Sequence, residues 1–123
     1  MANPNIVNVT SIYGNTSYLV PTGTTATTWT ALTPAVGTVN KIDNIVAANV
    51  TGTAATITVS VNSATGGGGT AYRLAYQIIV PANATLIICD KSTSFYLGEA
   101  QSIVVTSGTA SAIELVASYE AIT

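Results

Sequence analysis

Residues 55–62 alternate without interruption between apolar and polar side chains, and this pattern constrains the fold more than any other stretch of the sequence. A period of two residues is typical of a strand with one buried face and one solvated face. The apolar face carries Ala55, Ile57, Val59 and Val61, and the polar face carries Thr56, Thr58, Ser60 and Asn62. A polar gap at Thr51-Gly52-Thr53 separates this strand from an apolar run over residues 42–50, so we expect the two segments to form a hairpin.

The same reasoning divides most of the chain into short strands separated by Gly, Pro and Asn. The predicted strands cover residues 5–13, 17–20, 39–50, 55–62, 72–80, 85–89, 95–97, 101–106 and 111–121. A turn is expected at Gly14-Asn15, and residues 22–28 form either a loop or a Thr-rich edge strand. No segment has a helical period. Eight or more short strands predict an all-β protein, an antiparallel β-sandwich of either jelly-roll or immunoglobulin-like topology.

Three local features refine this prediction. The alternation over residues 39–50 is imperfect, so either both faces of that strand are buried or a bulge near Asp43-Asn44 shifts the register. Residues 72–80 and 85–89 flank a turn that begins at Pro81, which predicts a second hairpin. The run Gly66 to Gly69 predicts a flexible exposed loop, because it lacks the following helix and the Lys-Ser/Thr ending of a phosphate-binding loop.

The chain is short and poor in charge. Its 123 residues fit one domain, which we divide into an uncharged Thr-rich N-terminal arm with the first strands (1–38) and a sandwich core (39–123). Only 7% of the residues are charged, and the net charge is −2, so little electrostatic repulsion opposes association. We therefore expect the surface to be solvated through Thr, Ser and Asn and partly covered by other subunits, and we expect a homo-oligomer.

The residue chemistry argues against catalysis and against several classes of partner. The chain has no His, and its acidic residues are scattered, so we expect no enzymatic activity, no metal and no cofactor. Nucleic acid is not an expected partner, because Lys41, Arg73 and Lys91 do not form a basic cluster. No apolar run approaches the length of a membrane span, so no membrane is expected either, and the first residues do not resemble a secretion signal. The single cysteine, Cys89, lies in an apolar segment and is predicted to be a buried thiol.

The aromatic residues are the candidates for binding. The spacing of Tyr72, Tyr76 and Tyr119 within predicted strands indicates core or cross-strand packing. Trp29 lies among threonines and is predicted to be exposed or in an interface. With Tyr13 and Tyr18 it forms the predicted interface set, because an extended N-terminal segment can add its edge to the sheet of a partner.

Several strand and turn motifs resemble a group of small virion structural proteins of tailed bacteriophages, particularly phages of aquatic bacteria and cyanobacteria. The motifs are KIDNIVAANV at residues 41–50, GTAY at 69–72, VPANA at 80–84, DKST at 90–93 with Tyr96-Leu97, and ASYE at 117–120. The resemblance implies a β-sandwich located on the virion and assembled in the host cytoplasm. It implies most directly a capsid decoration (cement) protein that binds the major capsid protein or other virion subunits.

Two alternative functions are also compatible with the sequence. A tail, neck or fibre-base protein would assemble along the tail axis instead of on the shell. A carbohydrate-binding or adhesin module would require Trp29 and the loop tyrosines to lie together on one exposed face.

Overall fold

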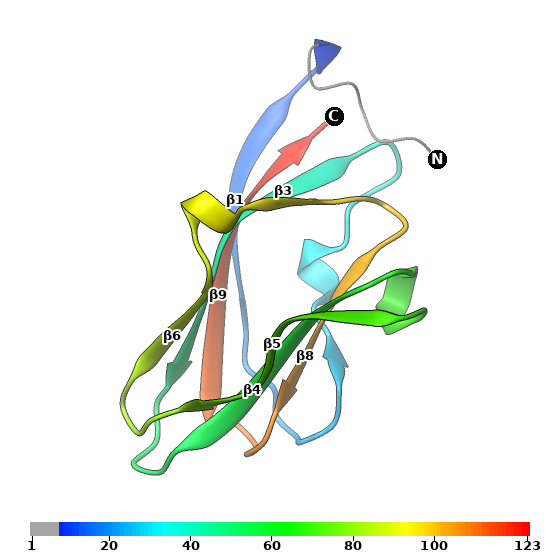
Figure 1. Ribbon diagram of the computed structural model, residues 1–123. Helices are drawn as coiled ribbons and strands as arrows, with labels where there is room; N and C mark the ends of the chain where they lie inside the picture. The colour runs from blue at the N-terminus through cyan, green and yellow to red at the C-terminus, as the bar shows by residue number, and fades with distance from the viewer. Residues whose placement is uncertain (1–7) are drawn as a thin grey trace.

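The computed structural model describes residues 8–123, which form two antiparallel sheets packed face to face (Figure 1). The strands are β1 (Ile12–Leu19), β2 (Thr27–Thr28), β3 (Val39–Asn49), β4 (Ala55–Asn62), β5 (Ala71–Val80), β6 (Thr85–Cys89), β7 (Phe95–Leu97), β8 (Ser102–Ser107) and β9 (Ile113–Ile122). Short 3₁₀ turns lie between them, namely η2 (Thr30–Leu32), η3 (Thr65–Gly67) and η4 (Lys91–Thr93). The predicted all-β sandwich is therefore confirmed.

The strand order defines the topology. Sheet A has the order β1-β9-β3-β6, with β7 also paired to β3, and sheet B has the order β2-β8-β4-β5. The chain alternates between the two sheets from one strand to the next. The exception is the step from β4 to β5, which are both in sheet B; the short β7 is left out of this comparison. Two four-stranded layers interleaved in this way are a jelly roll, which decides between the two topologies that the sequence left open.

The core lies between the sheets and is built from the apolar positions that alternate along β3, β4, β8 and β9. Fully buried side chains include Ile45, Ile57, Ile103 and Leu115, one from each of these strands. The predicted inward faces of residues 55–59, 101–106 and 113–117 are therefore correct. Trp29 and Leu32 close the core from the segment between β2 and β3.

The two predicted hairpins are wrong, although their strands exist. β3 lies in sheet A and β4 in sheet B, so the turn between them crosses the sandwich. Asn49 fixes this turn, because its Nδ2 donates to the carbonyl oxygens of Thr53 (2.8 Å) and Val80 (3.0 Å). β5 and β6 are likewise divided between the sheets. The buried faces of successive strands meet across the core, which strand periodicity alone does not reveal.

Two expectations about strand regularity have opposite outcomes. Of the two alternatives for residues 39–50, the bulge near Asp43-Asn44 is present, because the register between β3 and β9 shifts between Ile42 and Asn44. The turn predicted at Gly14-Asn15 is wrong, because β1 continues through both residues in unbroken register with β9. The paired neighbour strand supplies backbone partners along the whole segment, which overrides the local turn tendency.

Residues 12–38 contribute to the sandwich. β1 pairs with β9 over its full length, β2 pairs with β8, and Trp29 is buried in the core. The first residues of the predicted strand 5–13 lie outside the described part of the chain.

The glycine loop between β4 and β5 is more constrained than its composition suggests. Asn62 Nδ2 donates to the Gly67 carbonyl oxygen (2.9 Å), and the Gly67 amide donates to Ser102 Oγ (3.0 Å). Ser102 Oγ in turn donates to the Ala64 carbonyl oxygen (2.7 Å). These hydrogen bonds tie the loop to β8. The loop is therefore less flexible than its four glycines predict.

Candidate protein interfaces

The described residues contain no arrangement suited to metal binding, since no group of three or more Cys, Asp or Glu side chains converges. No helix in residues 8–123 has the length and hydrophobicity needed to cross a bilayer.

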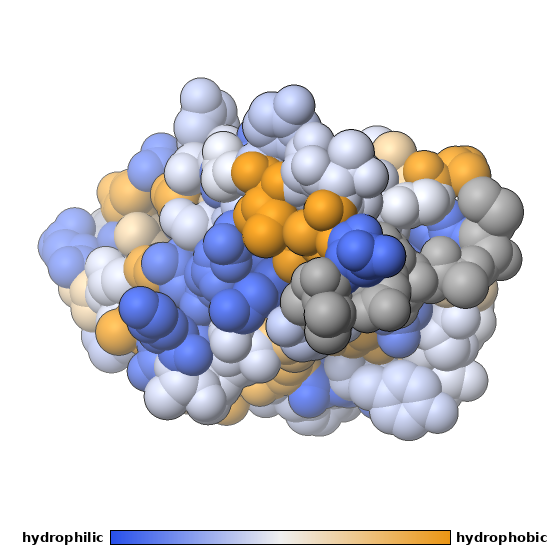
Figure 2. Space-filling view, turned by 90° about the horizontal axis from the view of Figure 1, so that it is seen from above, coloured by the Kyte–Doolittle hydropathy of each residue, from blue (hydrophilic) through white to orange (hydrophobic). Residues whose placement is uncertain are grey.

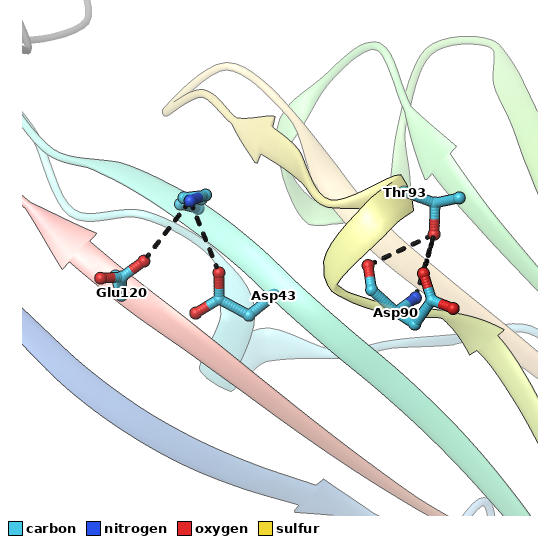
Figure 3. Close-up of polar contacts among 5 residues, drawn as sticks. Asp43, Asp90, Thr93 and Glu120 are labelled. Atoms are coloured by element: carbon cyan, nitrogen blue, oxygen red, sulfur yellow. Dashed lines mark hydrogen bonds and ion pairs between the residues drawn. The ribbon is translucent and has the colours of Figure 1, made fainter.

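Charged side chains cluster at one end of the outer face of sheet A, in a shallow polar depression of about 600 Å³. Lys41 Nζ lies 3.9 Å from both Asp43 Oδ1 and Glu120 Oε2, from β3 and β9 respectively (Figure 3). Asp43 lies at the bulge in β3, two residues along the strand from Lys41. Partly exposed pairs at this distance contribute less than about 1 kcal/mol each, so they mark a solvated surface.

Asp90 caps the η4 turn beside this depression (Figure 3). Its Oδ1 accepts hydrogen bonds from the Ser92 hydroxyl (2.6 Å) and the Ser92 amide (3.0 Å). These bonds favour the ionised carboxylate and hold the pKa of Asp90 below its ordinary value of 3.8. Its role is therefore structural.

Cys89 is buried where β6 meets β3. Burial away from water raises the pKa of its thiol above the ordinary value of 9.0, which disfavours the thiolate. The predicted buried thiol is confirmed.

Trp29, predicted to be exposed or in an interface, is buried at 1% exposure, so this prediction is wrong. Its indole Nε1–H donates to Ser17 Oγ of β1 at 3.0 Å. The ring fills the space between the sheets, and its polar edge needs a partner there, which the strand hydroxyl supplies. The threonines around Trp29 in sequence did not reveal this position.

The other two predicted interface residues are at the surface. Tyr13 and Tyr18 both lie in β1 and are exposed at 65% and 77%. They do not lie together, because residues of opposite parity point to opposite faces of a strand. No part of the structure tests their contact with a partner, so their role stays a prediction.

The largest concentration of exposed apolar side chains was not predicted. Five residues of β5 form it, and we call them the β5 surface: Tyr72, Leu74, Tyr76, Ile78 and Ile79. Of the two positions predicted for Tyr72 and Tyr76, core or cross-strand packing, the core position is wrong, since they are exposed at 65% and 58%. The Arg73 guanidinium lies over the Tyr76 ring, 5.1 Å from its centroid. Arg73 is also the single charged residue within the strands of sheet B.

The pairing of β5 with β4 explains this exposure. Two register shifts interrupt it, one between Ile57 and Val59 and the other between Val59 and Ser60. Gln77 has a positive φ of 49° at the first shift, and its amide donates to Thr58 Oγ1 (2.9 Å). Each bulge changes which parity faces inward, so only Ala75 and Val80 are buried in the strand. The sequence signal was the adjacent pair Ile78-Ile79, which places apolar side chains on both faces.

A second apolar surface crosses the outer face of sheet A. Tyr18 is opposite Val116, which is opposite Val46, which is opposite Ile87. We call these four residues the sheet A row. Residues in register on adjacent strands point to the same face, so the row runs across β1, β9, β3 and β6.

The end of the molecule at which the C-terminus lies has a mixed surface (Figure 2). Hydrophobic side chains gather there in patches beside hydrophilic ones, with weakly polar residues between them.

Comparison with known proteins gives little further guidance. No protein-family model and no curated protein matches the chain. Among solved structures, the chain is similar to a protein of the extra small virus of the giant freshwater prawn Macrobrachium rosenbergii, seen by cryo-electron microscopy of its virus-like particle. The two share 17% identity with a TM-score of 0.35, over 98% of this chain and 85% of the other. At this level of similarity, nothing about function follows.

Proposed function

We propose that the protein is a non-enzymatic structural subunit of a virion, a capsid decoration protein that binds the major capsid protein and stabilises the shell. The observation that carries the proposal is the β5 surface, an exposed apolar strand on a chain with few charges. The jelly roll is compatible with it, because that fold serves capsid proteins, but the same fold also serves lectins and enzymes.

The size of the β5 surface supports a protein partner. With side-chain areas of about 150–250 Å², its five residues at 38–65% exposure present roughly 400–650 Å² in total, divided between the two faces of the strand. This total is half or more of the roughly 800 Å² that each partner buries in a standard interface.

The composition of the β5 surface favours a lasting contact. Aromatic residues and Arg are enriched at the centres of interfaces, and Tyr72, Tyr76 and Arg73 supply both. The two bulges disrupt the free backbone edge of β5, so recognition there rests on side chains and not on the addition of a strand.

The location on the particle is tested first. Particles of the phage that encodes this chain should contain it in many copies, and cryo-electron microscopy should place it on the capsid shell. Density at the neck or along the tail would favour the alternative tail protein. Absence of the chain from purified particles, measured by mass spectrometry, would refute both assignments.

The β5 surface is tested by adding the purified chain to particles that lack it. The triple variant Tyr72→Ser, Tyr76→Ser, Ile79→Ser should reduce co-sedimentation with the particles by at least about 100-fold, because central aromatic contacts dominate binding. The matched control is Val36→Ser, since Val36 is 76% exposed but lies outside β5. Equal binding by the triple variant and the control would show that another surface makes the contact.

The carbohydrate-binding alternative required Trp29 to lie on an exposed face with the tyrosines. Trp29 is buried, so this requirement is not met.

A further inference from the structure

Within residues 8–123, no strand pairs with the outer edge of β1, and this edge has none of the features that normally protect it. β1 is an end strand of sheet A and pairs with β9 over eight residues without a register shift. It contains no charged residue and no Pro. Long regular edges of this kind readily pair with another strand unless charges, Pro or bulges prevent it.

The backbone groups that point to this free edge can be identified. Ser11 and Thr123 exchange two hydrogen bonds, with the Ser11 amide donating at 3.2 Å and the Thr123 amide donating at 2.9 Å. Hydrogen-bonded and non-hydrogen-bonded pairs alternate along an antiparallel ladder. The odd-numbered residues of β1 therefore bond to β9, and the even-numbered residues direct their N–H and C=O groups outward. These are Ile12, Gly14, Thr16 and Tyr18.

We propose that β1 pairs with β1 of a second copy of this chain, antiparallel about a two-fold axis through Asn15, so that the two A sheets become one continuous sheet. This register places all four outward-directed residues in hydrogen-bonded pairs, Ile12 with Tyr18 and Gly14 with Thr16, and it forms about eight interchain hydrogen bonds. A register centred on Thr16 leaves Ile12 opposite Val20, which lies beyond the end of the strand, and forms fewer bonds.

The side chains favour the same register. Ile12 and Tyr18 are both largely exposed, and the pairing brings them into contact on the outer face. It places Ile12 of one copy next to Tyr18, the first residue of the sheet A row, of the other. Exposed apolar side chains therefore meet at the junction.

Gly14 and the net charge give further support. A Cβ at Gly14 would meet nothing within 4 Å, so no contact within the described chain requires a glycine in this strand. Glycine inside a strand often marks a place where another backbone approaches closely. The net charge of −2 opposes pairing of two copies only weakly. Because each copy has one β1 and the contact is two-fold, the assembly closes as a dimer.

The experiment compares Thr16→Pro with Thr16→Ala in the full chain. Proline removes an amide that points away from β9, so the sandwich should remain folded while dimerisation weakens by at least about 30-fold, since the substitution acts twice in a two-fold contact. Thr16→Ala keeps the amide and should dimerise as the unchanged chain does. Sedimentation velocity should give twice the 12.4 kDa chain mass for the dimer.

Amide exchange provides a second readout that does not depend on any variant. Raising the protein concentration should slow exchange of the even-numbered amides of β1 and leave the odd-numbered amides, already bonded to β9, unchanged. A chain that remains a monomer at millimolar concentration would overturn the proposal. So would a dimer in which the even-numbered amides exchange freely, or one that Thr16→Pro leaves intact. These outcomes do not depend on whether the chain belongs to a virion.

Discussion

The edge strands β1 and β5 differ in what they expose. β1 is regular and uncharged, and it presents backbone donors and acceptors in line. β5 contains two bulges, a positive φ at Gln77 and the charge of Arg73, and it presents apolar side chains instead. Bulges protect a strand against backbone pairing, but they also turn side chains of both parities toward solvent. The comparison teaches that one sandwich can offer two kinds of contact, one through the backbone and one through side chains.

The largest expected effect concerns how β1 is held in place. Trp29→Ala should lower the free energy of unfolding by about 3–5 kcal/mol, because it empties a large buried site and leaves Ser17 without its indole partner. Trp29→Phe keeps most of the ring volume and should cost about 1–2 kcal/mol. Urea denaturation measures both values. With the phenylalanine variant, β1 amides should lose more protection than β5 amides, and an equal loss would show that Trp29 does not hold β1 specifically.

The next effect concerns the loop that leads into β5. Gly67 has a φ of 80°, and a Cβ there would lie 2.6 Å from Thr28 Oγ1. Gly67→Ala should therefore cost about 2 kcal/mol or more. Gly68→Ala is the matched control, because Gly68 has a φ of −81° and its nearest contact is an ordinary 3.4 Å. Thermal unfolding compares the two variants, and equal stability would mean that the loop is free to move and does not fix the start of β5.

A smaller effect tests the bulge itself. Gln77→Val should cost about 1–2 kcal/mol, because a β-branched side chain is strained at a positive φ. Gln77→Gly should change stability by less than about 1 kcal/mol, since relief of that strain is offset by the greater freedom of glycine in the unfolded chain. If denaturation shows the valine variant to be as stable as the glycine variant, β5 can become regular, and its contrast with β1 would disappear.

The smallest effect is a response to acid. The pKa of Asp90 is lowered in the folded protein, so its cap contributes stability above the ordinary pKa of 3.8, and this contribution is lost as the pH falls through the lower folded value. Neither β1 nor β5 contains a carboxylate, so this loss should reach the η4 turn and neither edge. An NMR titration should place the Asp90 midpoint below 3.8 and show it rising in Ser92→Ala. A midpoint unchanged by that substitution would contradict the assigned cause.

The success of the sequence predictions depended on the range of the interactions involved. The burial of Ile57 and Val59 was predictable, because a two-residue period reports one buried face directly. The exposure of Tyr72 and Tyr76 was not, because it depends on how β5 registers against β4. The burial of Trp29 depends on Ser17, twelve residues away in another strand. The candidate surfaces were therefore predicted less well than the fold. Tyr18 is the residue that belongs both to the predicted interface set and to the sheet A row.

The sequence by itself determined that this chain forms short strands and which side chains of the regular strands face inward, because alternation is a local property of each segment. The tertiary structure decided which sheet each strand joins, where bulges shift the faces, and that β1 and β5 lie at free edges. These outcomes depend on contacts between residues far apart in the chain, whose free energy no single segment encodes.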